Sequence, residues 1–201
     1  MQPESAILAS ASPRLRGRED ELGLLRSQLH VLRRGRGSVT IVEGAPGAGK
    51  TRLLAAAVEI GLGFGTLIGS GGASRGDRLV PMGALLDSLI AGAEPLLDPG
   101  SFTDLRTLPE FRYWLIQEIE ERLERVASED AVVVVVDDLQ WADASSVAAF
   151  EALTVRLESL PIAWLGAVRT TEASADLRAT LARMCASGGE RVELEIGRAH
   201  V

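Results

Sequence analysis

Hydrophobic residues recur every three or four positions in some stretches of the chain and stand in short, continuous or alternating runs in others. The helical spacing predicts helices over 19–33, 50–59, 82–91, the segment after residue 110, the segment after residue 143, and 176–184. The short runs predict strands over 38–43, 65–69, 131–136, 162–168 and 191–195. Helices therefore alternate with strands. This pattern predicts an α/β fold of three layers (αβα), with a central parallel sheet of about five strands.

Local signals refine this prediction. Residues Ala131–Val136 are an alanine and five valines, a run typical of a central strand covered on both faces. Residues Arg191–Glu195 alternate between polar and apolar, so we expect an edge strand. Thr107–Glu110 has the T-x-x-E spacing of a helix capping box, and Asp143 can cap the helix that follows it. Glu118 and Arg122 are spaced as an ion pair on a helix surface.

The composition is that of a soluble globular domain: 201 residues, 46% hydrophobic and 24% charged. A net charge of −7 argues against this segment itself gripping DNA or an anionic membrane. The single cysteine, Cys185, excludes an internal disulfide and fits a reducing compartment. No apolar run approaches the roughly 20 residues of a membrane span. We therefore expect a cytoplasmic protein without a membrane partner.

One motif carries most of the chemical information. Lys50 is the only lysine of the chain, and it closes the segment Gly44–Thr51, which reads G-x-x-x-x-G-K-T. Glycines allow backbone N–H groups to turn toward phosphates, and a lysine carries a compact ammonium to them, which the flat guanidinium of arginine does not replace. A chance match is expected about once in a thousand such sequences. The predicted nucleotide contacts are Gly44, Ala45, Pro46, Gly47, Ala48, Gly49, Lys50, Thr51 and Arg52.

Two acids follow the valine strand. We predict that Asp137 holds Mg²⁺, while the hydroxyl of Thr51 ligates the metal directly. We predict that Asp138 lies on the γ-phosphate side, where a carboxylate orients or deprotonates the attacking water. The alternative is that both aspartates only end the strand as a turn.

Arg169 follows the next strand of the chain. Because ligands meet the carboxyl ends of strands in an open parallel sheet, we predict that Arg169 senses the γ-phosphate. A surface arginine at a strand exit is the alternative. Trp141 is expected to pack in the core or against a helix, and a place near the site is the alternative. No Cys/His cluster suggests a transition metal, and no Ser/His/Asp set suggests acyl transfer.

With these residues in hand, the chain resembles the STAND branch of P-loop ATPases. It is most similar to the AAA ATPase module of large bacterial LuxR-type transcriptional regulators, from Leu15 to Glu195. Leu15–Glu21 resembles the family's N-terminal G-R-E-x-E motif, which implies that Gly17 and Arg18 lie beside the adenine; Arg16 departs from the usual apolar residue. Val132–Asp143 matches the Walker B segment with its D-D-L-x-W-A-D extension, and Arg169 matches the arginine after the fourth strand.

The resemblance implies a regulatory switch that binds ATP or ADP with Mg²⁺ and that self-associates in the ATP state. DNA would be contacted only through a C-terminal domain outside this chain, and we expect hydrolysis by the segment alone to be slow or absent. Two alternatives stay open: an AAA ATPase of the replication-initiator or clamp-loader type, and the regulatory module of a class III adenylate cyclase or protein kinase. The acidic charge and the tryptophan extension favour the switch.

The expected domain organisation has three parts. Residues 1–14 form a flexible tail, and residues 15–195 form the ATPase domain, without the helical lid and winged-helix unit of the family. The last six residues, 196–201, match the translation of one frame of a common short-read sequencing adapter. We therefore expect a non-native tail there, with a genuine short protein as the alternative.

Overall fold

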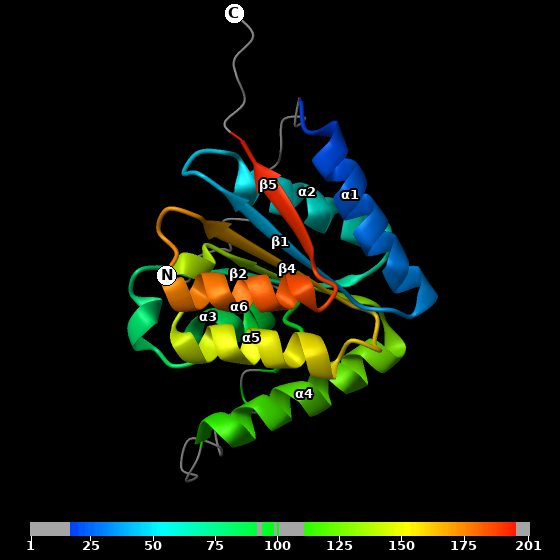
Figure 1. Cartoon of the computed structure of the whole chain (residues 1–201). Coiled ribbons are helices and arrows are strands. Elements are labelled where there is room, and N and C mark those ends of the chain that lie inside the picture. The colour runs from blue at the N-terminus through cyan, green and yellow to red at the C-terminus, as the bar shows by residue number, and fades with distance from the viewer. Residues whose placement is uncertain (1–16, 92–93, 99, 101–110, 196–201) are drawn as a thin grey trace, which may run out of the picture.

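The computed structural model describes residues 17–91, 94–98, 100 and 111–195. Within this part of the chain, five strands form one sheet in the order β2-β3-β4-β1-β5, and every neighbouring pair is parallel (Figure 1). The strands are β1 (Ser38–Gly44), β2 (Leu67–Gly72), β3 (Val132–Asp137), β4 (Ile162–Arg169) and β5 (Glu190–Leu194). The predicted three-layer fold, the central valine strand and the edge position of the last strand are confirmed.

Helices cover both faces of the sheet (Figure 1). One face carries α1 (Glu19–His30) and α2 (Lys50–Gly63), and the other carries α3 (Gly83–Ile90), α5 (Ala144–Arg156) and α6 (Ala175–Ala186). Helix α4 (Phe111–Glu129) packs against α5. Short 3₁₀ turns follow α1 (η1, Val31–Arg34), β2 (η2, Asp77–Leu79) and β3 (η5, Leu139–Trp141). None of the helices in the described ranges has the length and hydropathy needed to cross a bilayer.

The valine run explains why β3 lies inside the sheet. Val132, Val134 and Val136 join the hydrophobic cluster under α3, α4, α5 and α6, whereas Val133 and Val135 join the cluster under α1 and α2. Because alternate side chains point to opposite faces of a strand, a central strand needs apolar residues at every position. All five valines are buried, so β3 connects the two halves of the core.

Most local predictions agree with the structure. The Asp143 side chain caps α5 by accepting from the backbone of Ser145 and Ser146, and Arg122 pairs with Glu118 at 2.5 Å. The second strand begins two residues later than predicted, because Gly65 adopts a φ of 75° and ends the turn after α2. The predicted capping box at 107–110 lies outside the described residues.

The sheet order brings the predicted site residues to one edge. The last residue of β1, Gly44, pairs with Arg169 at the end of β4, and Asp137 ends the neighbouring strand β3. The carboxyl ends of these three strands lie on the left in Figure 1, where the segment between β1 and α2 also lies. A site can therefore form from segments more than one hundred residues apart in the sequence.

Candidate functional site: the loop between β1 and α2

The loop between β1 and α2 is shaped by its glycines. Gly47 and Gly49 have φ values of 78° and 93°, which residues with a Cβ rarely adopt, and a Cβ built on either would meet no atom within 4 Å. Gly44 is restricted in a different way, because a Cβ there would lie 2.7 Å from the carbonyl oxygen of Leu194. The loop thus needs glycine both for its turns and for its contact with β5.

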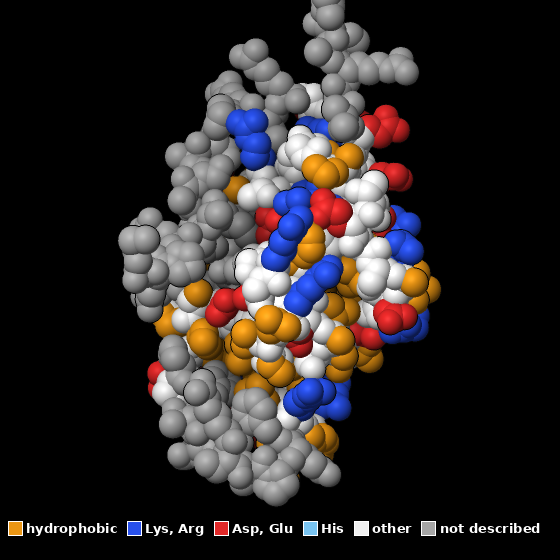
Figure 2. All heavy atoms as spheres, turned by 90° about the vertical axis from the view of Figure 1, so that its left-hand side faces the viewer, with side chains coloured by type: hydrophobic (Ala, Val, Ile, Leu, Met, Phe, Trp, Pro, Cys, Tyr) orange, Lys and Arg blue, Asp and Glu red, His pale blue; other side chains and the backbone are white. Residues whose placement is uncertain are grey.

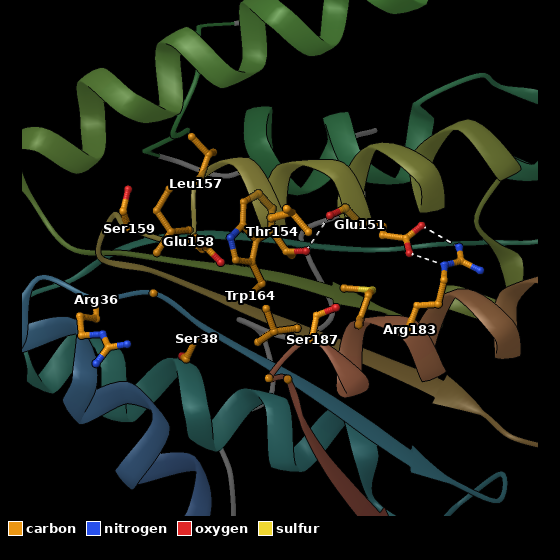
Figure 3. Close-up of a pocket in the computed structure, with 17 residues that line it drawn as sticks. Arg36, Ser38, Glu151, Thr154, Leu157, Glu158, Ser159, Trp164, Arg183 and Ser187 are labelled. Carbon is orange, nitrogen blue, oxygen red and sulfur yellow. Dashed lines mark hydrogen bonds and ion pairs between the residues drawn. The ribbon is translucent and has the colours of Figure 1, made fainter.

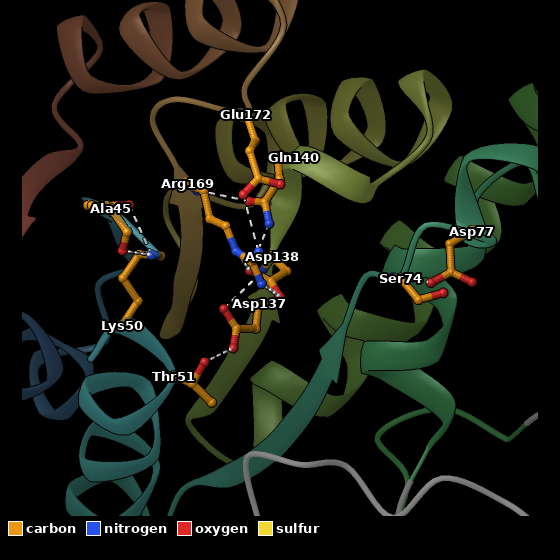
Figure 4. Close-up of polar contacts among 11 residues, drawn as sticks. Ala45, Lys50, Thr51, Ser74, Asp77, Asp137, Asp138, Gln140, Arg169 and Glu172 are labelled. Atoms are coloured by element: carbon orange, nitrogen blue, oxygen red, sulfur yellow. Dashed lines mark hydrogen bonds and ion pairs between the residues drawn. The ribbon is translucent and has the colours of Figure 1, made fainter. Parts of the chain in front are cut away.

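Lys50 begins α2 and is buried under this loop. Its Nζ donates to the carbonyl oxygens of Gly44 at 3.0 Å and Ala45 at 2.9 Å (Figure 4). Burial lowers the pKa of the Lys50 ammonium below its ordinary value, and the nearby carboxylate of Asp138 acts in the opposite direction. The ammonium is therefore held inside the loop by backbone oxygens.

Thr51 and Asp137 meet across the site. The Thr51 Oγ1 hydroxyl donates to Asp137 Oδ2 at 2.6 Å, while Asp137 Oδ1 accepts from the backbone N–H of Asp138 at 2.7 Å. Asp137 is only 6% exposed, and this burial raises the pKa of its carboxyl above the usual value, although the hydrogen bond from Thr51 opposes the shift.

This pair of oxygen ligands fits Mg²⁺. A magnesium ion takes one or two protein oxygens and completes its shell with water and phosphate oxygens, so it needs no larger protein cage. Accordingly, the described residues contain no group of three or more His, Cys, Asp or Glu side chains that could hold a metal. A carboxylate next to a hydroxyl, at the start of the helix that follows a glycine-rich loop, has the donor chemistry that a magnesium–phosphate complex requires.

Asp138 is engaged by two other side chains. Its carboxylate accepts from Arg169 Nε at 3.2 Å and Nη2 at 3.1 Å, and from Gln140 Nε2 at 2.7 Å (Figure 4). Arg169 also pairs with Glu172 at 3.2 Å, and its backbone N–H donates to Gln140 Oε1 at 2.9 Å. Asp138 itself has a φ of 53°, uncommon for a residue other than glycine. The acid predicted to act on water is thus held in a closed network with the predicted sensor arginine.

Comparison with known families finds one whose model matches most of this chain. A family model described as AAA ATPase domain matches residues 14–165, about three quarters of the chain. This chain belongs to the AAA ATPase domain family. A search of curated proteins finds no match.

Several solved structures share the fold of this AAA domain. They include Aeropyrum pernix ORC2 in ADPNP-ADP complexes, with a TM-score of 0.60 and 18% identity over 94% of this chain and 50% of that chain. Aeropyrum pernix ORC1 in complex with DNA gives 0.61 and 20%, over 94% and 48%. AMPPCP-bound DnaA from Aquifex aeolicus gives 0.53 and 18%, over 98% and 51%. This chain spans about half the length of these structures, and the similarity concerns the fold.

Of the remaining predicted contacts, Arg18 reaches the loop. Arg18 Nη2 donates to the carbonyl oxygen of Ala48 at 3.4 Å and to that of Glu195, and its Nη1 pairs with Glu21 at 2.7 Å. Gly17 and Arg52 are exposed. The N-terminal segment of the AAA domain therefore reaches the loop through Arg18.

Trp141 does not lie in the core, which was one of its two predicted places. It is partly exposed, and the guanidinium groups of Arg75 and Arg78 lie 4.6 and 4.7 Å from its ring centre. Arg78 also donates to the backbone oxygen of Gln140 at 2.7 Å. Figure 2 views the AAA domain from this side and shows basic and acidic side chains close together with hydrophobic groups among them.

Sequence reasoning missed the roles of Gln140, Arg75 and Arg78. Gln140 stands inside the D-D-L-x-W-A-D segment, so its place between two recognised acids was the available signal. The two arginines belong to a glycine-rich stretch without periodicity, and only the fold brings them to Trp141.

Asp143 has two roles in the AAA domain. Besides capping α5, its Oδ1 accepts from the backbone N–H of Met82 at 3.2 Å, immediately before α3. Met82 is fully buried with a φ of 65°, a strained conformation that this contact helps to hold. The residues from Asp137 to Asp143 thus contact α2, β4 and η2, and they link the start of α3 to α5.

Proposed function

We propose that this AAA domain binds Mg-ATP and works as a regulatory switch, the STAND-type ATPase module of a LuxR-type transcriptional regulator. The observation that carries nucleotide binding is the 2.6 Å hydrogen bond between Thr51 and Asp137 beside the buried Lys50. Thr51 and Asp137 supply the two oxygen ligands, and Lys50 supplies the cation, that a magnesium–triphosphate complex needs. Thr51 and Asp137 are 86 positions apart in the sequence.

Each part of the site has a role in this proposal. The backbone amides of Gly44–Thr51 and the Lys50 ammonium bind the phosphates, and Arg18, which contacts Ala48, lies on the adenine side. Thr51 and Asp137 hold Mg²⁺, which when bound neutralises phosphate charge. ATP and ADP are the expected ligands.

The ion pair between Asp138 and Arg169 gives the switch a mechanism. Both side chains are about 30% exposed, so their attraction is screened and the pair can be exchanged at modest cost. A γ-phosphate competes with Asp138 for the Arg169 guanidinium. When Arg169 turns to the phosphate, the Asp138 carboxylate becomes free to orient a water molecule. ADP lacks the group that competes, so the two nucleotides would favour different arrangements of the same residues.

Two features support the regulatory reading over a hydrolysis-driven machine. The G-R-E-x-E segment and the D-D-L-Q-W-A-D segment resemble the STAND branch, and the net charge is −7. The second candidate is an initiator-type AAA ATPase that binds DNA itself, because the fold is similar to that of Aeropyrum pernix ORC1, whose structure is a complex with DNA.

Calorimetric titration with ATP, with and without Mg²⁺, tests nucleotide binding. We expect saturable binding that Mg²⁺ strengthens. Thr51→Val, which keeps the shape but removes the hydroxyl, should abolish the Mg²⁺-dependent gain and leave Mg²⁺-free binding close to wild type. Equal Mg²⁺ dependence in both proteins would refute the proposed metal site.

Fluorescence anisotropy with duplex DNA separates the two candidates. The switch predicts no saturable DNA binding by this chain at about 0.15 M salt, with or without Mg-ATP. ATP-dependent binding that weakens steeply with salt would instead establish the initiator type, because each phosphate contact releases counterions.

A further inference from the structure

A second cavity lies at the opposite end of the sheet from Lys50. It has a volume of about 620 Å³ and opens between the C-terminal ends of α5 and α6, where they pass over the first residues of β1 and β4 (Figure 3). Val39, Ile162 and Trp164 form its sheet side, and Val155 and Met184 are among its helix side chains. This volume lies in the range of pockets that hold small molecules.

One residue of the pocket lining carries an unsatisfied hydrogen-bond donor. Trp164 is 1% exposed, and its indole Nε1 has no hydrogen-bond partner among the described residues. Two threonine hydroxyls share this property, at Thr40 and Thr66, but neither lines the pocket. A buried donor without a partner costs about 1–3 kcal/mol, so such a group in a pocket wall indicates an acceptor that the protein does not supply.

The position of Trp164 is fixed by its neighbours. It pairs with Val39 in the parallel register of β4 and β1, and Phe150 meets its ring edge-to-face with centroids 5.4 Å apart. In Figure 3 the indole nitrogen lies on the edge of the ring nearest Glu158. Because the nitrogen is covered by the lining, a ligand reaches it through rotamer changes of lining side chains.

The charged side chains of the lining indicate which net charge a ligand of this pocket can carry. The lining holds two arginines and two glutamates, which balance. Arg183 and Glu151 already neutralise each other through contacts of 2.8 and 2.9 Å, which leaves Arg36 and Glu158 as exposed charges of opposite sign. A net charge on a ligand would be attracted by one of these two side chains and repelled by the other, and it would lose its hydration beside the buried indole. A neutral molecule avoids that cost.

We propose that this pocket binds a small neutral molecule that has an apolar ring or chain and a carbonyl-type acceptor, which accepts the hydrogen bond of Trp164 Nε1–H. The apolar part packs between Val39, Ile162 and Met184. The site is separate from the loop of Gly44–Thr51 and does not depend on the function proposed for that loop.

The indole N–H resonance of Trp164 tests the proposal directly. The chain has three tryptophans, so its ¹⁵N spectrum shows three indole signals that Trp→Phe variants assign. The nucleotide-free protein is titrated with benzamide, benzoate and toluene. We expect benzamide to shift the Trp164 signal saturably, with an affinity about tenfold or more above that of toluene, the value of one buried hydrogen bond, and also above that of benzoate, whose charge must be desolvated. No saturable shift, or equal affinity for toluene, would overturn the proposal.

Variants complete the test. Trp164→Phe removes the donor and should weaken benzamide binding about tenfold, whereas Trp114→Phe, an exposed residue on α4, should leave it unchanged. Val39→Phe fills the pocket and keeps the Trp164 signal, so it tests where benzamide binds even if Trp164→Phe folds poorly. Benzamide binding that survives in Val39→Phe with unchanged affinity would place the ligand elsewhere and refute the site.

Discussion

The polar groups at the two ends of the central sheet differ in whether the protein itself supplies their hydrogen-bond partners. At the carboxyl end, β3 and β4 finish in Asp137 and Arg169, and both side chains have hydrogen-bond partners within the protein. At the amino end, β4 begins with Ile162 and Trp164 beside a cavity of mixed polar and apolar lining, and the buried indole N–H of Trp164 has no partner among the described residues. Strand β4 contributes residues to both ends.

This difference teaches how each end would recognise a ligand. The carboxyl end is a set of exchangeable contacts, in which an incoming anion must replace Asp138 on Arg169 and the loop carbonyls on Lys50. The amino end offers a contact that nothing in the described chain competes for. Ligand binding at the first end therefore rearranges charges, whereas at the second it satisfies a donor.

The largest expected effect separates the two ends by a single substitution. Lys50→Ala should weaken Mg-ATP binding about a hundredfold or more, because removing one partner of a desolvated ion pair costs about 3 kcal/mol or more. Benzamide binding at the amino end should not change. Calorimetry with both ligands measures this, and Arg33→Ala, in the exposed turn before β1, is the control. Retention of ATP affinity within tenfold would show that the loop lysine is not a phosphate ligand.

The next effect concerns the framework of the carboxyl end. Asp143→Ala removes the acceptor of three backbone N–H groups, those of Met82, Ser145 and Ser146. We expect a loss of about 2–3 kcal/mol in the free energy of unfolding, measured by urea denaturation, since a helix cap and a buried contact are lost together. Asp143→Asn keeps an acceptor oxygen and should lose less. A loss below about 1 kcal/mol for the alanine variant would mean that Asp143 is not the link between α3 and α5.

The sequence predicted the carboxyl end far better than the amino end, for a physical reason. A phosphate loop and a strand-ending acid pair are contiguous segments with strict residue requirements, and five valines can only lie where both faces are covered. The pocket has no such signature. Its walls come from the turn at Arg36, the end of α5 and the end of α6, and each of these residues is ordinary in its local context.

Intermediate features were predicted in part. The glutamine of D-D-L-Q-W-A-D could be located but its bridging role could not, because that role depends on Asp138 and Arg169, whose contact crosses between two strands. Trp141 was expected in the core or against a helix on its residue type alone. Its stacking with Arg75 and Arg78 requires η2 to lie beside η5, which only the folded chain determines.

A smaller effect tests whether the carboxyl end is strained without a ligand. Asp137→Asn should raise the free energy of unfolding of the nucleotide-free protein by about 1 kcal/mol, or 2–4 °C in Tm, because burial disfavours the carboxylate. The folded pKa of Asp137 is raised, so the folded state binds its proton more tightly than the unfolded chain does. As the pH rises above about 4, the ordinary pKa of an aspartate, the wild type loses the stability that the proton bound to Asp137 gives to the folded state.

The advantage of Asp137→Asn should accordingly be larger at pH 7 than at pH 4. Urea denaturation at both values measures the gap, and Glu121→Gln on the exposed side of α4 is a matched control. A variant less stable than wild type at pH 7 would show that the hydrogen bond from Thr51 outweighs the cost of burial.

The smallest effect is expected where an ion pair lies at the pocket rather than at the proposed nucleotide site. Arg183 contacts Glu151 through two nitrogens, but its side chain is 59% exposed, so water and salt screen the pair and its loss should not measurably change the unfolding midpoint.

Arg169→Gln should likewise change the stability of the nucleotide-free protein little, yet it should abolish discrimination between ATP and ADP. Calorimetry of both nucleotides on both variants measures the contrast. If Arg183→Gln altered that discrimination as strongly as Arg169→Gln, the two ends of the sheet would be coupled rather than independent. The exchange of Arg169 between Asp138 and phosphate would then not be sufficient to describe the switch.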